Sequence, residues 1–369
     1  MKRLVLAALA IGAMTACTKS NVQLEQPGEI SFQPVAQKAT KAAVDGTAYP
    51  TDAAYKFNVW AWWADVKPEE VTDMKAYFAS NNATPYISNG EFVHRGSGSW
   101  GGSTPYYWPT KGSLVFAGYS PASAKGTFTY DLTEQKFKVE NYIQSNNIAD
   151  AKDLMWFDVT DQLYDQNGAD GNGVPVKFRH ALSWLTFKFN LASDETAALW
   201  TITKVELNGI KDKANFTAVK GGTPTWEDWE KSADDKVLTS TLYKYNNIEE
   251  PYLIEYAGNG TVLRGTDVET AGSNVRTNAA LVIPQSCADA RLVITYNLKT
   301  YVGEGVLSGQ TVSLPLTGNQ ITNDGLLSFN KWDPGKHYIY TITFGGNEIL
   351  IAPTVTDWTD VNVDNIPVQ

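Results

Sequence analysis

The chain has 369 residues, of which 43% are hydrophobic and 12% aromatic, so it contains enough apolar material for real buried cores. Its length suggests two domains. Its formal net charge of −10 argues against nucleic acids and anionic membranes as partners, because both favour basic surfaces.

The start of the chain has the organisation of a lipoprotein signal peptide (residues 1–16). Lys2 and Arg3 give a positive start, and residues 4–13 form an uncharged apolar run that is too short to span a bilayer. Met14-Thr15-Ala16-Cys17 then resembles a bacterial lipobox, in which cleavage precedes the cysteine and the thiol is acylated. We therefore predict lipidation at Cys17. The alternative is an ordinary signal peptide that happens to end near a cysteine.

The next segment, residues 17–47, is predicted to be a tether that separates the lipid from the folded body. It is rich in Gln, Lys, Ala and Thr, and it contains one weak strand pattern, around residues 30–35. Helical patterns are scarce in the rest of the chain. Residues 67–78 are the best helix candidate, and residues 194–199 and 226–233 are interpreted as single turns.

Strand patterns dominate the remainder of the sequence. Residues 114–119 and 292–296 are short apolar runs, and apolar residues alternate with polar ones after Leu185 and again after Tyr338. A period of two, repeatedly broken by Gly, Asn, Asp and Pro, predicts an all-β sandwich protein. The loop at residues 165–173 (DQNGADGNG) is the clearest break, so we predict β-sandwich domains at residues 48–172 and 173–369.

No pattern in the chain indicates catalysis. His94, His180 and His337 lie outside any metal-ligand spacing, and no serine-hydrolase or nucleotide-binding motif is present. Cys287 is interpreted as a small core residue, which leaves no intramolecular disulfide if Cys17 is acylated. We therefore expect neither an enzyme nor a cofactor or metal site.

Five of the twelve tryptophans gather near the start of the predicted first domain: Trp60, Trp62, Trp63, Trp100 and Trp108. Exposed tryptophans stack on sugar rings, so a glycan-binding surface is one interpretation. Packing in a core or at a subunit interface is the favoured alternative. Trp62 and Trp63 must point to opposite faces of a strand, because consecutive residues of a strand alternate.

Several segments occur in an order that resembles the fimbrillin (Mfa-like) family of Bacteroidales. The segments, as they stand in this sequence, are FNVWA at 57–61, YYWP at 106–109, LVFAGYSP at 114–121, FRHAL at 178–182, the strand at 203–208, LVIPQ at 281–285, WDPGK at 332–336 and VTDW at 355–358. The resemblance implies two transthyretin-like β-sandwich domains in tandem, in a component of a type V pilus. It also implies an outer-membrane, surface-exposed lipoprotein whose partners are other fimbrial subunits and whose role is to support adhesion to host or bacterial surfaces.

The resemblance further implies assembly by donor-strand exchange. A protease removes the N-terminal segment with its first strand, here residues 30–35, and a strand of a neighbouring subunit fills the groove. The family is cleaved at an arginine, but none occurs between Arg3 and Arg95, so Lys38 and Lys41 are the nearest substitutes. A subunit that remains lipidated would act as an anchor instead. The candidate donor residues all have odd numbers: Ile349, Ile351, Val355, Val361 and Val363.

The same C-terminal segment could equally be the last strand of its own domain. A surface lipoprotein that binds glycans through exposed tryptophans is the alternative function.

Overall fold

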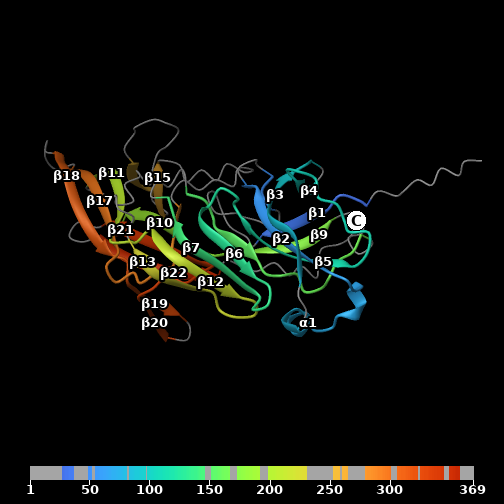
Figure 1. Cartoon of the computed structure of the whole chain (residues 1–369). Helices are drawn as coiled ribbons and strands as arrows, with labels where there is room; N and C mark the ends of the chain where they lie inside the picture. The colour runs from blue at the N-terminus through green and yellow to red at the C-terminus, as the bar shows by residue number, and fades with distance from the viewer. Residues whose placement is uncertain are drawn as a thin grey trace, which may run out of the picture.

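The computed structural model describes most of the chain between residues 27 and 357. The described residues are 27–36, 49–51, 55–80, 83–96, 98–145, 151–166, 173–191, 198–230, 252–257, 260–264, 279–300, 306–322, 325–344 and 349–357. Nearly all of its regular structure is β, which confirms the predicted all-β class (Figure 1). None of the helices in this part of the chain is long and apolar enough to span a bilayer.

The N-terminal half forms a closed seven-stranded barrel in the order β1-β4-β3-β2-β5-β8-β9. Its strands are β1 (Ser31–Ala36), β2 (Phe57–Ala64), β3 (Thr84–His94), β4 (Trp100–Gly102), β5 (Ser113–Ser120), β8 (Met155–Phe157) and β9 (Val174–His180). Every pairing in this barrel is antiparallel except that of β1 with β9, which is parallel. β1 therefore closes the barrel between β4 and β9.

The C-terminal half contains two larger sheets that share one core, and a separate hairpin. The first sheet has the order β16-β10-β21-β22, and the second has the order β15-β14-β11-β17-β18. Residues of β10, β21, β11 and β17 meet in this core, which includes Phe187, Val205, Leu292 and Tyr340. The strands are β10 (Ser183–Leu191), β11 (Ala198–Asn208), β14 (Tyr252–Ala257), β15 (Gly260–Arg264), β16 (Ala279–Val282), β17 (Arg291–Thr300), β18 (Val306–Pro315), β21 (Lys336–Phe344) and β22 (Ile349–Asp357), with the hairpin β19 (Gly318–Thr322) and β20 (Gly325–Phe329).

A fourth sheet joins the two halves. Its order is β13-β12-β7-β6, so strands from before and after the 165–173 loop pair in one sheet: β6 (Lys125–Asp131), β7 (Lys136–Ile143), β12 (Lys213–Val219) and β13 (Thr225–Glu230). Its core includes Trp156 from the barrel and Trp184 and Leu281 from the C-terminal half. β9, which follows the loop, still belongs to the barrel. The domain division at residues 172 and 173 therefore remains a prediction, whereas the change of sheet falls between β9 and β10.

The helix predicted over residues 67–78 is divided in two. Pro68–Glu70 is a short 3₁₀ turn, and α1 spans Met74–Ser80. The division occurs because Asp73 caps the second piece, with the Ala76 amide donating to its carboxylate at 2.9 Å. The helical turn predicted at 226–233 is wrong for its described part, because residues 226–230 lie in β13.

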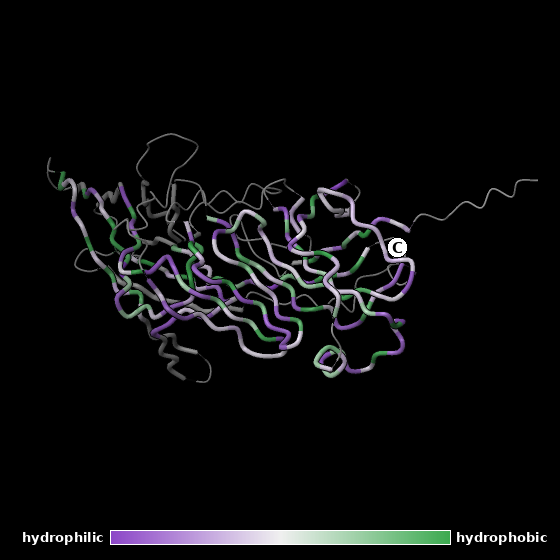
Figure 2. The backbone as a smooth tube through the Cα atoms, viewed as in Figure 1, coloured by the Kyte–Doolittle hydropathy of each residue, from purple (hydrophilic) through white to green (hydrophobic). Residues whose placement is uncertain are grey.

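The period-two patterns correspond to strands with one buried face. Tyr338, Tyr340, Ile342 and Phe344 on β21 are all at most 2% exposed, as the alternation predicts. β5 is buried along its whole length, which explains its continuous apolar sequence. Figure 2 shows hydrophobic and hydrophilic residues alternating along many of the strands.

Candidate functional site

β1 fills a slot in the barrel wall and directs alternate side chains into the core. Ile30, Phe32 and Pro34 are buried, whereas Gln33 between them is exposed. Five consecutive residues of β1, beginning with Phe32, pair with β9, and Ser31 and Phe32 pair with β4 on the other side. Burying Ile30 and Phe32 contributes about 1.5–3 kcal/mol each before entropy is counted.

Phe32 lies at the centre of an aromatic cage. Its ring centroid is 4.8 Å from Phe92, 5.2 Å from Phe116 and 5.8 Å from Phe57, in each case edge to face. Edge-to-face packing is the favoured geometry of aromatic pairs. Because all four rings are fully buried, removing β1 would leave an apolar groove floored by phenylalanine side chains.

The chain just before β1 is also held in place. The Ile30 amide donates to the Tyr106 carbonyl at 2.7 Å, and the Trp108 amide donates to the Gly28 carbonyl at 3.0 Å. Arg95 lies 3.6 Å from Glu29, but both side chains are well exposed, so this ion pair adds little stability. These contacts extend the pairing of β1 toward its N-terminal side.

Two residues show how closely the slot fits its strand. Gly173, immediately before β9, has a φ of +96°, and a Cβ atom there would lie 2.9 Å from the Phe32 amide nitrogen. Only glycine meets both conditions without strain. Pro34 lies beyond the last β4 partner of β1, where its missing N–H costs no pairing with β4.

Tyr49, the first described residue after β1 in the sequence, packs on the barrel core. Its ring lies 4.9 Å from Phe178 and 5.0 Å from Trp100, and its hydroxyl donates to the Tyr55 carbonyl at 2.7 Å. Burial strongly raises the pKa of this phenol, so it stays neutral. Tyr49 therefore packs on side chains of β4 and β9, the two strands that flank β1.

Among the described strands, the C-terminal strand β22 lies at the edge of its sheet and pairs with β21. The antiparallel register sets Ile349, Ile351 and Val355 opposite Phe344, Ile342 and Tyr338. In this single chain the segment is thus the last strand of its own sheet, one of the two interpretations left open by the sequence. Val361, Val363, Cys17, Lys38 and Lys41 lie outside the described residues.

The tryptophans near the start of the barrel are largely packed inside. Trp62, Trp100 and Trp108 are 9%, 2% and 4% exposed, and Trp60 and Trp63 are half-buried. Trp62 and Trp63 pack in different clusters, as expected for consecutive residues of a strand. Packing, the favoured interpretation, therefore accounts for these residues.

The other residues considered for chemistry are also in packed positions. The side chains of His180 and Asp153 are fully buried and 2.6 Å apart, and His337 stacks on Trp184 at 3.5 Å. Burial raises the pKa of the Cys287 thiol to about 11, which keeps it protonated and unreactive. No cluster of three or more metal-ligating side chains occurs in the described part of the chain.

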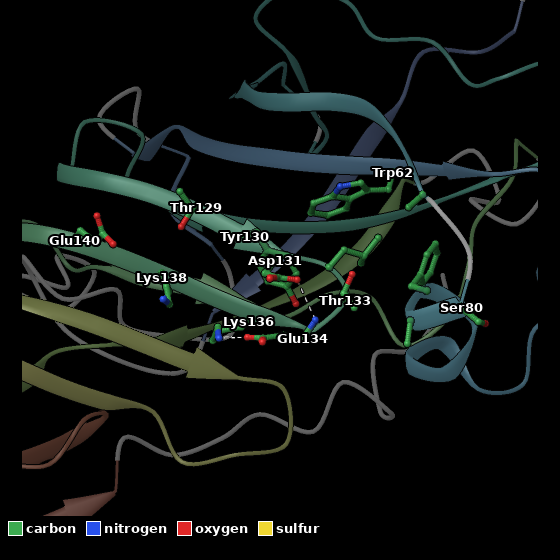
Figure 3. A pocket seen from close by; sticks show the side chains of 14 residues that line it. Trp62, Ser80, Thr129, Tyr130, Asp131, Thr133, Glu134, Lys136, Lys138 and Glu140 are labelled. Carbon is green, nitrogen blue, oxygen red and sulfur yellow. Dashed lines mark hydrogen bonds and ion pairs between the residues drawn. The ribbon is translucent and has the colours of Figure 1, made fainter.

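Two of the cavities lined by the described residues lie outside the slot. One, of about 900 Å³, is bounded by α1 and the β6–β7 hairpin and is lined mainly by polar side chains such as Thr129, Asp131 and Glu140 (Figure 3). Lys136 in this cavity is paired with Glu134. The other, of about 780 Å³, is mainly apolar and adjoins Trp229, a residue that the sequence did not single out. The only signal for it was the second tryptophan of WEDWE, at residues 226–230.

The fold is that of an all-β protein in which the first described strand, β1, closes a barrel by inserting between β4 and β9. The family model described as fimbrillin-like matches residues 40–358, so the chain belongs to the fimbrillin-like family. This membership makes it a fimbrial, cell-surface type of protein. No curated protein is significantly similar to it.

Two solved structures illustrate the similarity. A fimbrial protein from Bacteroides vulgatus is 18% identical, with a TM-score of 0.55 over 90% of this chain and 99% of that chain. A protein provisionally assigned to cell adhesion, from Bacteroides uniformis, is 15% identical, with a TM-score of 0.47 over 90% of this chain and 98% of that one. At such identities the first likeness concerns the fold alone.

Proposed function

We propose that this protein is a subunit of surface fimbriae that assembles by donor-strand exchange and supports adhesion. The single observation that carries the proposal is the insertion of β1 between β4 and β9, with Phe32 in an aromatic cage. Loss of β1 would leave two unpaired strand edges beside an apolar floor. Such a groove is the kind of site that accepts a strand from a partner by β-augmentation.

The sequence supplies a donor whose pattern matches the strand it would replace. Ile30, Phe32 and Pro34 have the spacing apolar-x-apolar-x-Pro, and Ile349, Ile351 and Pro353 repeat it in the same direction. A strand that matched β1 position by position would lay Ile351 where Phe32 lies and Pro353 where Pro34 lies. It would then run parallel to β9, as β1 does. Val355, Val361 and Val363 would continue the odd-numbered face of the donor beyond this match.

Release of β1 requires one cut in the chain between Ala36 and Tyr49. Lys38 and Lys41 are the basic residues in this interval. Tyr49 would keep the new N-terminal region attached to the barrel core through its contacts with Trp100 and Phe178. If this cut does not occur, acylated Cys17 would hold the protein in the outer membrane as an anchor for other subunits.

The test is digestion of the whole chain with a lysine-specific protease, followed by size-exclusion chromatography and mass spectrometry. We expect cleavage at Lys38 or Lys41, loss of the β1 fragment on mild warming, and a ladder of multimers. The double variant Lys38→Gln/Lys41→Gln should remain monomeric. Cleaved protein that loses β1 yet stays monomeric would overturn donor-strand exchange.

A peptide competition tests the donor register separately. A synthetic peptide of residues 349–363 should suppress the ladder by occupying the groove, because it carries the matching pattern. The same peptide with Ile351→Asp should not compete, since a carboxylate cannot enter an apolar cage without a large desolvation cost. Equal competition by both peptides would show that this register is wrong.

A further inference from the structure

A preformed cleft lies in the C-terminal half, away from the β1 slot. It has a volume of about 780 Å³ and is bounded by β13 and by loops at residues 209–211, 284–289 and 330–336. This volume is within the range of ligand-binding pockets, about 300–1,000 Å³. Its lining is mainly apolar and includes Trp229, Pro224, Pro284 and Pro334, with polar side chains such as Lys211 and Asp289 at the same site.

Trp229 supplies the main exposed aromatic surface of the cleft. It is 39% exposed, whereas Trp226 and Trp332 beside it are 6% and 1% exposed. Its indole N–H donates to the Pro284 carbonyl at 2.9 Å, which fixes the ring and uses its one polar group. The exposed part of Trp229 therefore offers a fixed apolar ring face to a ligand.

A β-bulge directs Trp229 toward this cleft. On β12, Lys213 faces Glu230 of β13, and Asn215 faces Glu227. The two residues of β12 are two positions apart, whereas those of β13 are three positions apart. The extra residue lets Trp226 and Trp229 both line the cleft, although they are three positions apart in sequence. Bulges often re-aim side chains near functional sites.

Asn215 stabilises this bulge from the neighbouring strand. Its side-chain amide donates to the Asp228 carboxylate at 2.9 Å, and Asp228 has a φ of +54°. The Asn215 side-chain oxygen accepts from the Asn141 amide at 2.8 Å, where β7 has a bulge of its own. Asn215 is thus a positioning residue for Trp229, because it holds the strained backbone beside it.

Several backbone groups in the other walls of the cleft are already paired. The Lys211 amide donates to the Gln285 side chain at 2.8 Å, and Gln285 donates back to the Lys211 carbonyl at 2.8 Å. The Trp332 amide donates to the Gln285 carbonyl at 2.9 Å. These paired groups are not available to an incoming strand, which argues against a donor peptide on these walls.

We propose that this cleft binds a neutral oligosaccharide, with a sugar ring stacked on Trp229. Sugars combine an apolar C–H face with a rim of hydroxyl groups, which matches an indole face beside Lys211, Asp289 and Asn330. Charges of both signs occur here, and Lys331 and Asp333 pair at 2.9 Å, so no single net charge is favoured. The cavity beside α1 is a weaker candidate, because its Trp62 is only 9% exposed.

The test is to screen the whole chain on an array of neutral and acidic oligosaccharides and to measure the strongest neutral binder by calorimetry. Trp229→Ala should weaken binding by about tenfold or more, whereas Trp229→Phe should restore much of it. Asn215→Ala should weaken binding by about threefold through loss of positioning. Tyr107→Ala is the matched control, because Tyr107 is an exposed aromatic residue (49%) that does not line the cleft.

Thermal unfolding of each variant checks that the fold is retained, and the Phe variant keeps the test decisive if Trp229→Ala is unstable. No binding of any neutral oligosaccharide, or equal binding by wild type and Trp229→Ala, would overturn the proposal. The site is independent of strand exchange, so Trp229→Ala should still form multimers after β1 release. Failure of one proposal therefore leaves the other testable.

Discussion

β1 and β22 are the first and last described strands, and the structure holds them differently. β1 pairs on both sides and closes a barrel, whereas β22, within the described part of the chain, pairs with β21 at the edge of an open sheet. Removing β1 would therefore open a groove with two free edges, while removing β22 would free only one. Two strands with a similar sequence pattern can therefore differ in position: β1 lies between two neighbouring strands, whereas β22 lies at the edge of its sheet.

The largest expected effect comes from emptying the aromatic cage. Phe32→Ala should lower the free energy of unfolding by about 3–5 kcal/mol, because it removes a fully buried ring from between Phe57, Phe92 and Phe116. Urea denaturation measures this change. Gln33→Ala, on the exposed face of β1, is the control and should stay within about 0.5 kcal/mol of the wild type. Equal effects of the two substitutions would mean that β1 does not close the barrel.

A pair of glycine variants tests the fit between β1 and its slot. Gly173 and Gly96 have φ values of +96° and +90°, but only at Gly173 would a Cβ atom meet another group, the backbone of β1. Gly96→Ala should cost about 1 kcal/mol of stability from backbone strain alone. Gly173→Ala should cost about 1–2 kcal/mol more, because β1 must shift.

Denaturant unfolding of both variants, before and after release of β1, separates the cost of backbone strain from the cost of the contact with β1. The excess cost at Gly173 should disappear once β1 has been removed. An excess that persists would assign it to another contact of the loop.

The Cys287 thiol reports on the C-terminal core. Its pKa is raised from 9.0 to about 11 by burial, so between these values the unfolded thiol loses its proton while the folded thiol keeps it. Stability should therefore fall as the pH rises through this window, and no contribution is expected below about pH 9. Thiol labelling at pH 8 should be negligible in the wild type.

Labelling should also stay negligible in Phe32→Ala, because Phe32 and Cys287 belong to separate cores. Rapid labelling of that variant would show that the two halves open together. Cys287→Ser, with no reactive thiol at this position, is the control for labelling elsewhere.

The smallest effect should come from the ion pair that precedes β1. Glu29→Gln removes the charge that faces Arg95 at 3.6 Å, and it should lower stability by about 0.2–1 kcal/mol at low salt. Raising the salt concentration should erase the difference, because exposed charges are screened. A large, salt-independent loss would mean that Glu29 contributes by packing or hydrogen bonding instead.

Much of the local structure followed from the sequence, since hydrophobic period is a local property. The alternation after Tyr338 predicted β21, and the apolar run at 114–119 predicted β5. The weak pattern at residues 30–35 predicted the strand that became β1. The helix predicted at 67–78 was only partly right: a 3₁₀ turn at 68–70 and α1 at 74–80 replace it, and Asp73 caps the second piece.

The candidate sites were predictable in unequal measure. The strand pattern of β1 and the odd-numbered donor residues could be found in the sequence, because side-chain alternation requires no knowledge of partners. The role of Trp229 could not be found, since its position depends on a bulge stabilised by Asn215 and Asp228. An exposed tryptophan and a buried one have the same sequence signal.

The sequence by itself determined the all-β class, the position of several strands such as β1, β5 and β21, and the matching patterns at 30–34 and 349–353. Only the tertiary structure decided which strands pair: that β1 lies between β4 and β9, that β9 stays with the barrel, and that β6 and β7 share a sheet with β12 and β13. The physical reason is that the period of a strand records which face is buried, whereas its partners are chosen by hydrogen bonds and packing between residues far apart in the chain.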